Sequence, residues 1–140
     1  MKQIPVIFWT GTGNTQMMAD VIAEAINAAG AEAVVKNVSE ISADEATGYA
    51  ALALGCPAMG AEVLEECEFE PFFTELEGKL AGKRVALFGS YGWGGSYMQD
   101  WEARVKDAGA ELVADGVLAL GAPDDEAEAK LAEAGKLLAE

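Results

Sequence analysis

Short apolar runs and amphipathic stretches alternate along the chain. The apolar runs predict β-strands at residues 6–9, 33–35, 50–54 and 84–88, and a last strand at 112–113 together with 116–120. Several of these runs are apolar on both faces, as expected for strands that helices cover from both sides. The pattern therefore predicts a parallel sheet rather than the half-exposed strands of an antiparallel one.

Between the strands, apolar residues return every three or four positions, which is the spacing of an amphipathic helix. The predicted apolar faces are Met18, Val21, Ile22, Ala25 and Ile26; Phe69, Phe72, Phe73, Leu76 and Leu80; Tyr97, Met98, Trp101, Val105 and Ala108; and Ala127, Leu131, Ala134 and Leu138. Gly30 and Gly109 stand where two of these helices should end. Residues 39–47 are polar and predict either a short helix capped by Ser42 or a loop.

Strands that alternate with helices predict an α/β fold, a three-layer sandwich with helices on both faces of a five-stranded sheet. A length of 140 residues suits one domain with one core, so residues 1–140 are expected to fold as a unit. The ligand site of such a fold lies beyond the carboxyl ends of the strands, where the strand order reverses. The loops after the first, third and fourth strands are therefore the candidates for a binding site.

The chain is strongly acidic, with 24 acidic and 9 basic residues and a formal net charge of -15. This charge repels phosphates, so nucleic acid and anionic membrane surfaces are not expected partners, whereas basic protein surfaces are. No apolar run reaches the roughly 18 residues that span a membrane, and residues 1–5 lack the apolar region of a signal peptide. We expect a cytoplasmic monomer.

Histidine is absent and Cys56 and Cys67 are the only cysteines. One chain therefore cannot assemble a four-ligand zinc site from cysteine and histidine, and catalysis by histidine is excluded. Both cysteines are expected to be reduced and structural, although their spacing also permits a disulfide.

The loop after the first strand, residues 10–15, reads Thr-Gly-Thr-Gly-Asn-Thr and leads directly into a helix. Backbone N–H groups at a helix N-terminus bind anions, and the glycines let an anion approach closely. A P-loop would need a lysine, and a dinucleotide fingerprint would need a small residue in place of Gln16, so a phosphomonoester fits better. The alternative is a turn that only caps the helix.

The other two loops carry groups that can cover a flat ring. Residues 55–62 contain Met59, Gly60 and Glu62, and residues 89–96 place Trp93 among glycines. A thioether and an indole on opposite faces of an aromatic ligand would form an apolar sandwich around it. The alternative is that Met59 and Trp93 fold back onto the core.

Residues 9–15, 54–60 and 88–94 together resemble the short-chain flavodoxins of anaerobic bacteria, as do residues 62–73 and 123–127. The resemblance extends over nearly the whole chain. It implies the flavodoxin-like sandwich, with a five-stranded parallel sheet of order 2-1-3-4-5, and non-covalent binding of FMN. The chain departs from the family pattern at Ala61, at residues 95–96 and at Gly121.

The resemblance also implies which residues bind FMN. The implied set is Thr10, Gly11, Thr12, Gly13, Asn14, Thr15, Ala58, Met59, Gly60, Ala61, Glu62, Ser90, Tyr91, Gly92, Trp93 and Gly94. Residues 10–15 would surround the phosphate, Met59 and Trp93 would cover the two ring faces, and residues 90–92 would follow the ribityl chain and pyrimidine edge. Glu62 would approach the pyrimidine N3–H, and the carbonyl of Gly60 would turn to accept a hydrogen bond from the protonated N5.

The implied function is that of an electron-transfer protein, not an enzyme, which cycles FMN between quinone, semiquinone and hydroquinone states. Carboxylates near the ring, such as Glu62, Glu65 and Glu66, should disfavour the anionic hydroquinone and give a low potential. Acidic residues would steer docking onto basic patches of redox partner proteins.

Two other classes of protein share this strand pattern. An FMN-dependent NAD(P)H reductase would need a second dinucleotide site, which the chain does not offer. A signalling receiver domain would need acidic residues after the first strand and a phosphorylatable aspartate after the third. Thr10 and residues 56–57 stand at those places instead.

Overall fold

The computed structural model describes residues 2–9, 11, 13–58, 64–65, 67–91 and 96–140. Its strands are β1 (Gln3–Phe8), β2 (Glu32–Asn37), β3 (Ala51–Gly55), β4 (Arg84–Tyr91), β5 (Glu111–Leu112) and β6 (Val117–Leu120). Its helices are α1 (Asn14–Ala28), α2 (Ala43–Ala46), α3 (Phe69–Glu77), α4 (Ser96–Asp107) and α5 (Asp125–Ala139), with a 3₁₀ turn η1 (Val38–Glu40) before α2.

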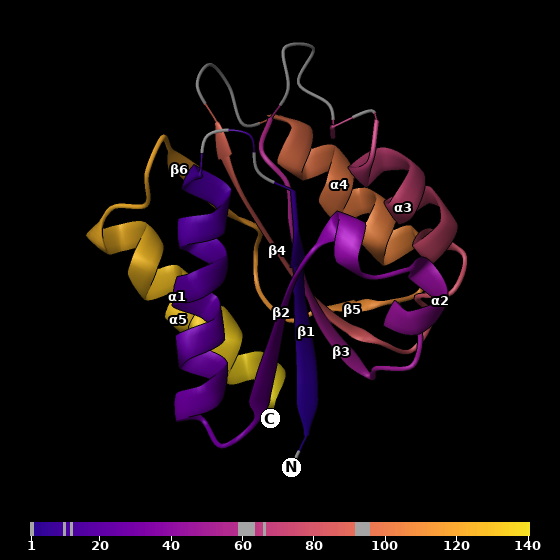
Figure 1. Cartoon of the computed structure of the whole chain (residues 1–140), viewed down its shortest axis with the longest axis horizontal. Helices are drawn as coiled ribbons and strands as arrows, with labels where there is room; N and C mark the ends of the chain where they lie inside the picture. Colours follow the sequence, from indigo (N-terminus) through magenta and orange to yellow (C-terminus); the bar gives the residue numbers. More distant parts are fainter. Residues whose placement is uncertain (1, 10, 12, 59–63, 66, 92–95) are drawn as a thin grey trace.

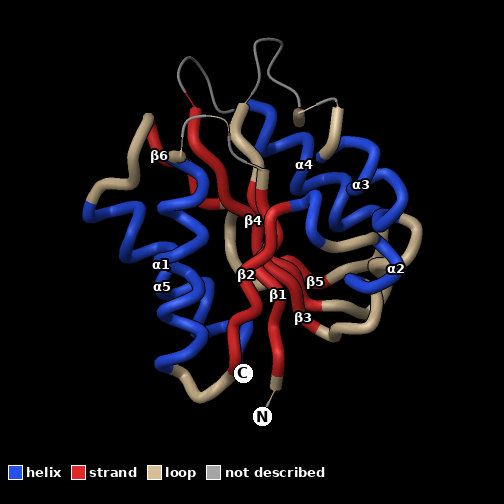
Figure 2. Tube along the Cα trace, viewed as in Figure 1, coloured by secondary structure: helices blue, strands red, loops and turns tan. Residues whose placement is uncertain are grey.

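The strands form one parallel sheet of order β2-β1-β3-β4-β5, and β6 also pairs with β4. This confirms the predicted fold and strand order. Figure 1 shows the sheet between two helical layers, with α1 and α5 on one side and α2, α3 and α4 on the other. The same view coloured by secondary structure separates the central strands from both layers (Figure 2).

The fifth position of the sheet is divided between β5 and β6. From Val85 to Phe88, β4 advances three residues, while its partner advances five, from Leu112 to Val117. The extra residues bulge out of the ladder, where the Gly116 N–H donates to the Glu102 carboxylate at 2.7 Å. Both predicted pieces of the last strand are therefore present, as β5 and β6, and an unpaired bulge separates them.

Each face of the sheet has its own apolar core. Val6 and Phe8 of β1 face α1 and α5, whereas Ile7 between them faces α3 and α4. This alternation is the two-residue period of a β-strand. On the second face, the Trp101 ring meets Phe69 and Phe73 edge-on, with ring centroids 5.4 and 5.8 Å apart.

The polar segment at residues 39–47 forms the short helix rather than the loop. The Ser42 hydroxyl accepts a hydrogen bond from the Glu45 N–H at 3.1 Å, and the Glu45 carboxylate accepts one from the Ser42 N–H. This capping box confirms Ser42 as the N-cap of α2. Gly30 has a φ of 95° directly after α1, as expected for a helix end that requires the left-handed region.

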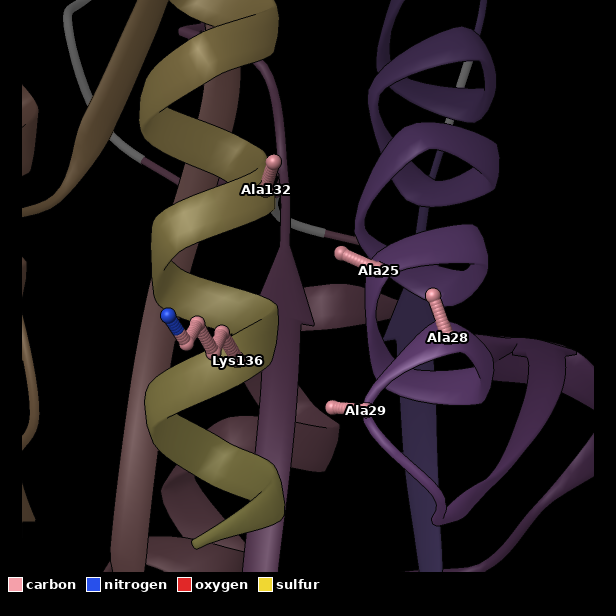
Figure 3. A pocket seen from close by; sticks show the side chains of 5 residues that line it. All are labelled: Ala25, Ala28, Ala29, Ala132 and Lys136. Carbon is pink, nitrogen blue, oxygen red and sulfur yellow. The ribbon is translucent and has the colours of Figure 1, made fainter.

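Helices α1 and α5 pack closely because small residues line their contact. A Cβ at Gly135 would lie 2.8 Å from the carbonyl oxygen of Ile22. Beside this contact, four alanines and Lys136 line a shallow groove (Figure 3). The groove lies at the end of α1, away from the carboxyl ends of the strands. None of the helices in the described ranges is long and apolar enough to cross a membrane.

Candidate functional site

The three loops singled out in the sequence leave the sheet at one edge. Phe8 of β1 aligns with Gly55 of β3, which aligns with Phe88 of β4. The backbone hydrogen bonds between neighbouring segments continue past the ends of the strands. The Trp9 N–H donates to the carbonyl of Gly55 at 3.0 Å, and the Ala58 N–H donates to the carbonyl of Ser90 at 2.9 Å. This edge is at the top of Figure 1.

Helix α1 begins at this edge in a form suited to an anion. Gly13 occupies its N-cap with a φ of 93°, a conformation that glycine adopts without strain. The first turn contains no acidic residue. Gly13 has no side chain, and a Cβ at this position would meet nothing within 4 Å beyond its chain neighbours. The space and the N–H donors at the helix end fit a phosphate group.

A pair of buried hydroxyls joins this helix to the sheet. Thr15 is 1% exposed and Ser90 is 5% exposed, and their side-chain oxygens lie 3.2 Å apart. One hydroxyl donates to the other. The contact holds the first turn of α1 against the end of β4, which brings the first and third of the predicted loops together.

Cys56 begins the loop after β3 and is fully buried. Its N–H donates to the carbonyl of Phe88 at 3.1 Å, and its Sγ accepts the Glu65 N–H at 3.3 Å. Burial raises the pKa of the Cys56 thiol to about 12. Cys56 and Cys67 form no disulfide with each other in the structure. The contact between Cys56 and Glu65 therefore joins two described segments that follow β3.

Glu65 has a role that its place in the sequence did not reveal. Its carboxylate accepts hydrogen bonds from the N–H groups of Cys67 and Glu68 at 2.7 Å and of Phe69 at 2.9 Å. Burial by itself would raise the pKa of this carboxyl, but the three N–H donors outweigh that effect and the pKa is lowered. Glu65 thus satisfies donors at the start of α3. The signal in the sequence is a glutamate shortly before an apolar helical pattern.

Two further contacts tie neighbouring segments to the same edge. The Trp9 indole N–H donates to the carboxylate of Glu68 at 3.2 Å, which links the end of β1 to the start of α3. The Gly121 N–H donates to the carbonyl of Tyr91 at 3.1 Å. Gly121 has a φ of 72°, so the residue that departs from the family pattern occupies a turn that favours glycine.

The structure describes only part of the predicted set. Gly11 is exposed, Thr15 and Ser90 are buried, and the other described members are half-buried, namely Gly13, Asn14, Ala58 and Tyr91. The predicted residues outside the described ranges are Thr10, Thr12, Met59, Gly60, Ala61, Glu62, Gly92, Trp93 and Gly94. No cluster of three metal-ligating side chains occurs among the residues that the structure describes.

Comparison with known proteins identifies a family that covers most of the chain. The family model described as flavodoxin matches residues 6–135. A flavodoxin of Clostridium beijerinckii is 47% identical over 96% of this chain and 97% of its own length. A flavodoxin of Megasphaera elsdenii is 44% identical over 82% of this chain and 85% of its own length. The solution structure of the two-electron reduced Megasphaera elsdenii protein superposes with a TM-score of 0.90 at 41% identity, covering 97% of this chain and 98% of that one.

The fold is that of doubly wound α/β proteins whose ligand site lies at the carboxyl edge of the sheet. Within that class, the chain belongs to the flavodoxin family. Flavodoxins are electron-transfer proteins rather than enzymes, they bind FMN, and they pass electrons to redox partner proteins. These relatives do not favour the alternative of an FMN-dependent NAD(P)H reductase.

Proposed function

We propose that residues 10–15, 58–62 and 90–94 together bind FMN, with the phosphate at the start of α1 and the ring between the other two loops. The Thr15–Ser90 contact supports this proposal most directly, because it joins the helix that would bind the phosphate to the strand that leads into the ring site. One domain, residues 1–140, supplies the whole set.

The phosphate is bound by neutral donors. Asn14 and Thr15 open a helix whose first turn carries no acidic residue, and the helix dipole favours a negative group there. Neutral donors are significant in a chain of net charge -15, because they bind the phosphate without a lysine or arginine beside it. FMN supplies the one-electron redox chemistry, while the protein fixes its position and surroundings.

Met59 and Trp93 cover opposite faces of the ring, and Glu62 accepts the pyrimidine N3–H. The carbonyl of Gly60 accepts a hydrogen bond from N5 once that nitrogen is protonated. The described ends of both loops support these roles, because Ala58 and Ser90 are hydrogen-bonded to each other at the same edge of the sheet.

The protein acts as a low-potential carrier, a monomer in the cytoplasm that docks onto basic patches of its redox partners. The net charge of -15 supports this role. Long-range attraction between this acidic chain and a basic partner speeds their encounter more than it strengthens the final complex. Transient complexes suit a carrier that must release one partner before it meets the next.

A comparison of FMN with riboflavin tests the phosphate site. The apoprotein should bind FMN at least about 100-fold more tightly than riboflavin, because several charge-assisted hydrogen bonds are absent with riboflavin. Anaerobic stepwise reduction of the loaded protein should then show two separate one-electron steps in the visible spectrum. Equal affinity for the two flavins, or direct two-electron reduction by NADH, would contradict the proposal.

A further inference from the structure

Three hydrogen bonds meet at Cys56, where the loop after β3 begins. The Cys56 N–H is bonded to β4, and the Cys56 Sγ accepts the Glu65 N–H. The third bond comes from α4, where the Tyr97 hydroxyl donates to the Cys56 carbonyl at 2.7 Å. Every polar backbone group of Cys56 therefore has a partner, although each partner belongs to a different part of the fold.

The Tyr97 side chain is held in the position that this hydrogen bond requires. Tyr97 is 2% exposed, and its ring belongs to the core on the α3 and α4 face of the sheet. Burial raises the pKa of the hydroxyl, and the neighbouring Cys56 adds to the effect, so the group remains a donor at neutral pH. A phenylalanine would fill the same core position and would lack only this bond.

Gly89 has no side chain, which leaves room for the hydrogen bond between Tyr97 and Cys56. A Cβ at this position of β4 would overlap both the carbonyl oxygen of Cys56 and the hydroxyl of Tyr97. Its backbone conformation does not lie in the left-handed region, so a turn does not explain the glycine. The close approach of α4 to the start of the loop does explain it.

We infer that Tyr97 is a positioning residue, whose hydroxyl fixes the start of the loop after β3 and thereby sets how tightly the protein binds FMN. The inference rests on the proposed function, in which residues 58–62 form part of the FMN site. A loop that is already fixed at its base loses less conformational entropy when a ligand orders it. Without the hydroxyl, the buried Cys56 carbonyl loses the hydrogen bond that α4 donates to it, and the start of the loop is less firmly fixed.

Tyr97→Phe tests this inference, with Tyr49→Phe as the matched control. Tyr49 is half-buried at the opposite end of β3, where its carbonyl accepts a hydrogen bond from Lys83. In the apoprotein, Tyr97→Phe should speed amide hydrogen exchange at Ala58 and Glu65 about tenfold. Exchange at Leu52 and Leu54 in β3 should stay unchanged, and the FMN dissociation constant should rise about tenfold.

Two outcomes would overturn the inference. Equal acceleration at all four amides would mean that the hydroxyl contributes only to global stability. Selective acceleration with unchanged FMN affinity would mean that the base of the loop does not matter for binding. Tyr49→Phe should alter neither the amide hydrogen exchange at Ala58 and Glu65 nor the affinity for FMN.

Cys56→Ala provides an independent variant if Tyr97→Phe fails to fold. It removes the Sγ that accepts the hydrogen bond from the Glu65 N–H. Amide exchange should again speed up selectively at Ala58 and Glu65, and the affinity for FMN should fall as in Tyr97→Phe. Exchange is measured without FMN, so it tests the closure of the loop even if the wild-type protein does not bind FMN. That last result would contradict the proposed function alone.

Discussion

The hydroxyl oxygens of Thr15 and Ser90 lie 3.2 Å apart although 75 positions separate the two residues in the chain. One belongs to the first turn of α1 and the other to the end of β4. Because both side chains are buried, their contact fixes the distance between the proposed phosphate site and the proposed ring site.

Thr15→Val should weaken FMN binding about tenfold, because a methyl group replaces a hydroxyl and the Ser90 hydroxyl loses its buried partner. Isothermal titration of the apoprotein measures this change. Thr47→Val is the control, since the Thr47 hydroxyl donates to the Asp44 carbonyl at the far end of the molecule. An unchanged affinity in Thr15→Val would contradict a binding role for the hydroxyl pair.

Glu65→Gln should lower the free energy of unfolding by about 1–3 kcal/mol at pH 7, since charge-assisted hydrogen bonds to three N–H groups are weakened. The folded state lowers the pKa of Glu65 below its ordinary value of 4.5. Its stabilisation is therefore fully present above pH 4.5 and is lost as the pH falls through the lowered pKa.

The difference in stability between Glu65→Gln and the wild type should consequently shrink as the pH falls below about 4.5. Urea unfolding between pH 7 and pH 3 measures it. Glu75→Gln, an exposed position on α3, should differ little from the wild type throughout. A difference that stays constant with pH would show that the Glu65 charge is not what stabilises the start of α3.

Arg104→Lys should lower the free energy of unfolding by about 1 kcal/mol. The Arg104 guanidinium donates to Glu70 at 2.8 and 2.9 Å and to Glu77 at 3.0 Å, and it lies 4.7 Å from the centroid of the Phe73 ring. Lysine cannot form the paired bonds that join α3 to α4. Lys130→Gln, which removes an exposed pair with Glu126, should change stability by less than about 0.5 kcal/mol. Equal effects would refute the special role of the Arg104 pairs.

Alkylation of the native protein at pH 8 should modify Cys67 and leave Cys56 unmodified. Cys67 is exposed, whereas Cys56 is buried and its pKa is raised to about 12, so it has almost no thiolate at that pH. Peptide mapping by mass spectrometry distinguishes the two sites, and both should react in urea. Modification of Cys56 under native conditions would contradict the buried position.

Gly89→Ala should lower the free energy of unfolding by about 2–3 kcal/mol, because the added methyl overlaps a backbone carbonyl that cannot move freely. Gly78→Ala is the control. Gly78 has a φ of -71°, and a Cβ at this position would lie in open space, so this change should alter the free energy of unfolding by less than about 0.5 kcal/mol. Chemical denaturation of both variants gives the comparison. A tolerated alanine at position 89 would mean that α4 does not approach the loop as closely as described.

Local patterns were sufficient to predict the elements. The apolar periodicities correctly predicted the helices that pack on each face. For residues 39–47 the sequence left a short helix and a loop open, and the structure forms the helix capped by Ser42. The two pieces of the last strand were predicted as separate apolar runs. The bond from Gly116 to Glu102, a residue of a different helix, could not be predicted from local patterns.

The sequence by itself determined the fold class, the acidic charge and the three loops that carry the candidate site, because periodicity, composition and short motifs are local properties. The tertiary structure alone decided the contacts between residues distant in the chain. Thr15 meets Ser90, and Tyr97 meets Cys56, only because a parallel sheet aligns the ends of its strands at one edge. Hydrogen bonds act over about 3 Å, so which hydroxyl meets which carbonyl is fixed only once helices and strands have packed.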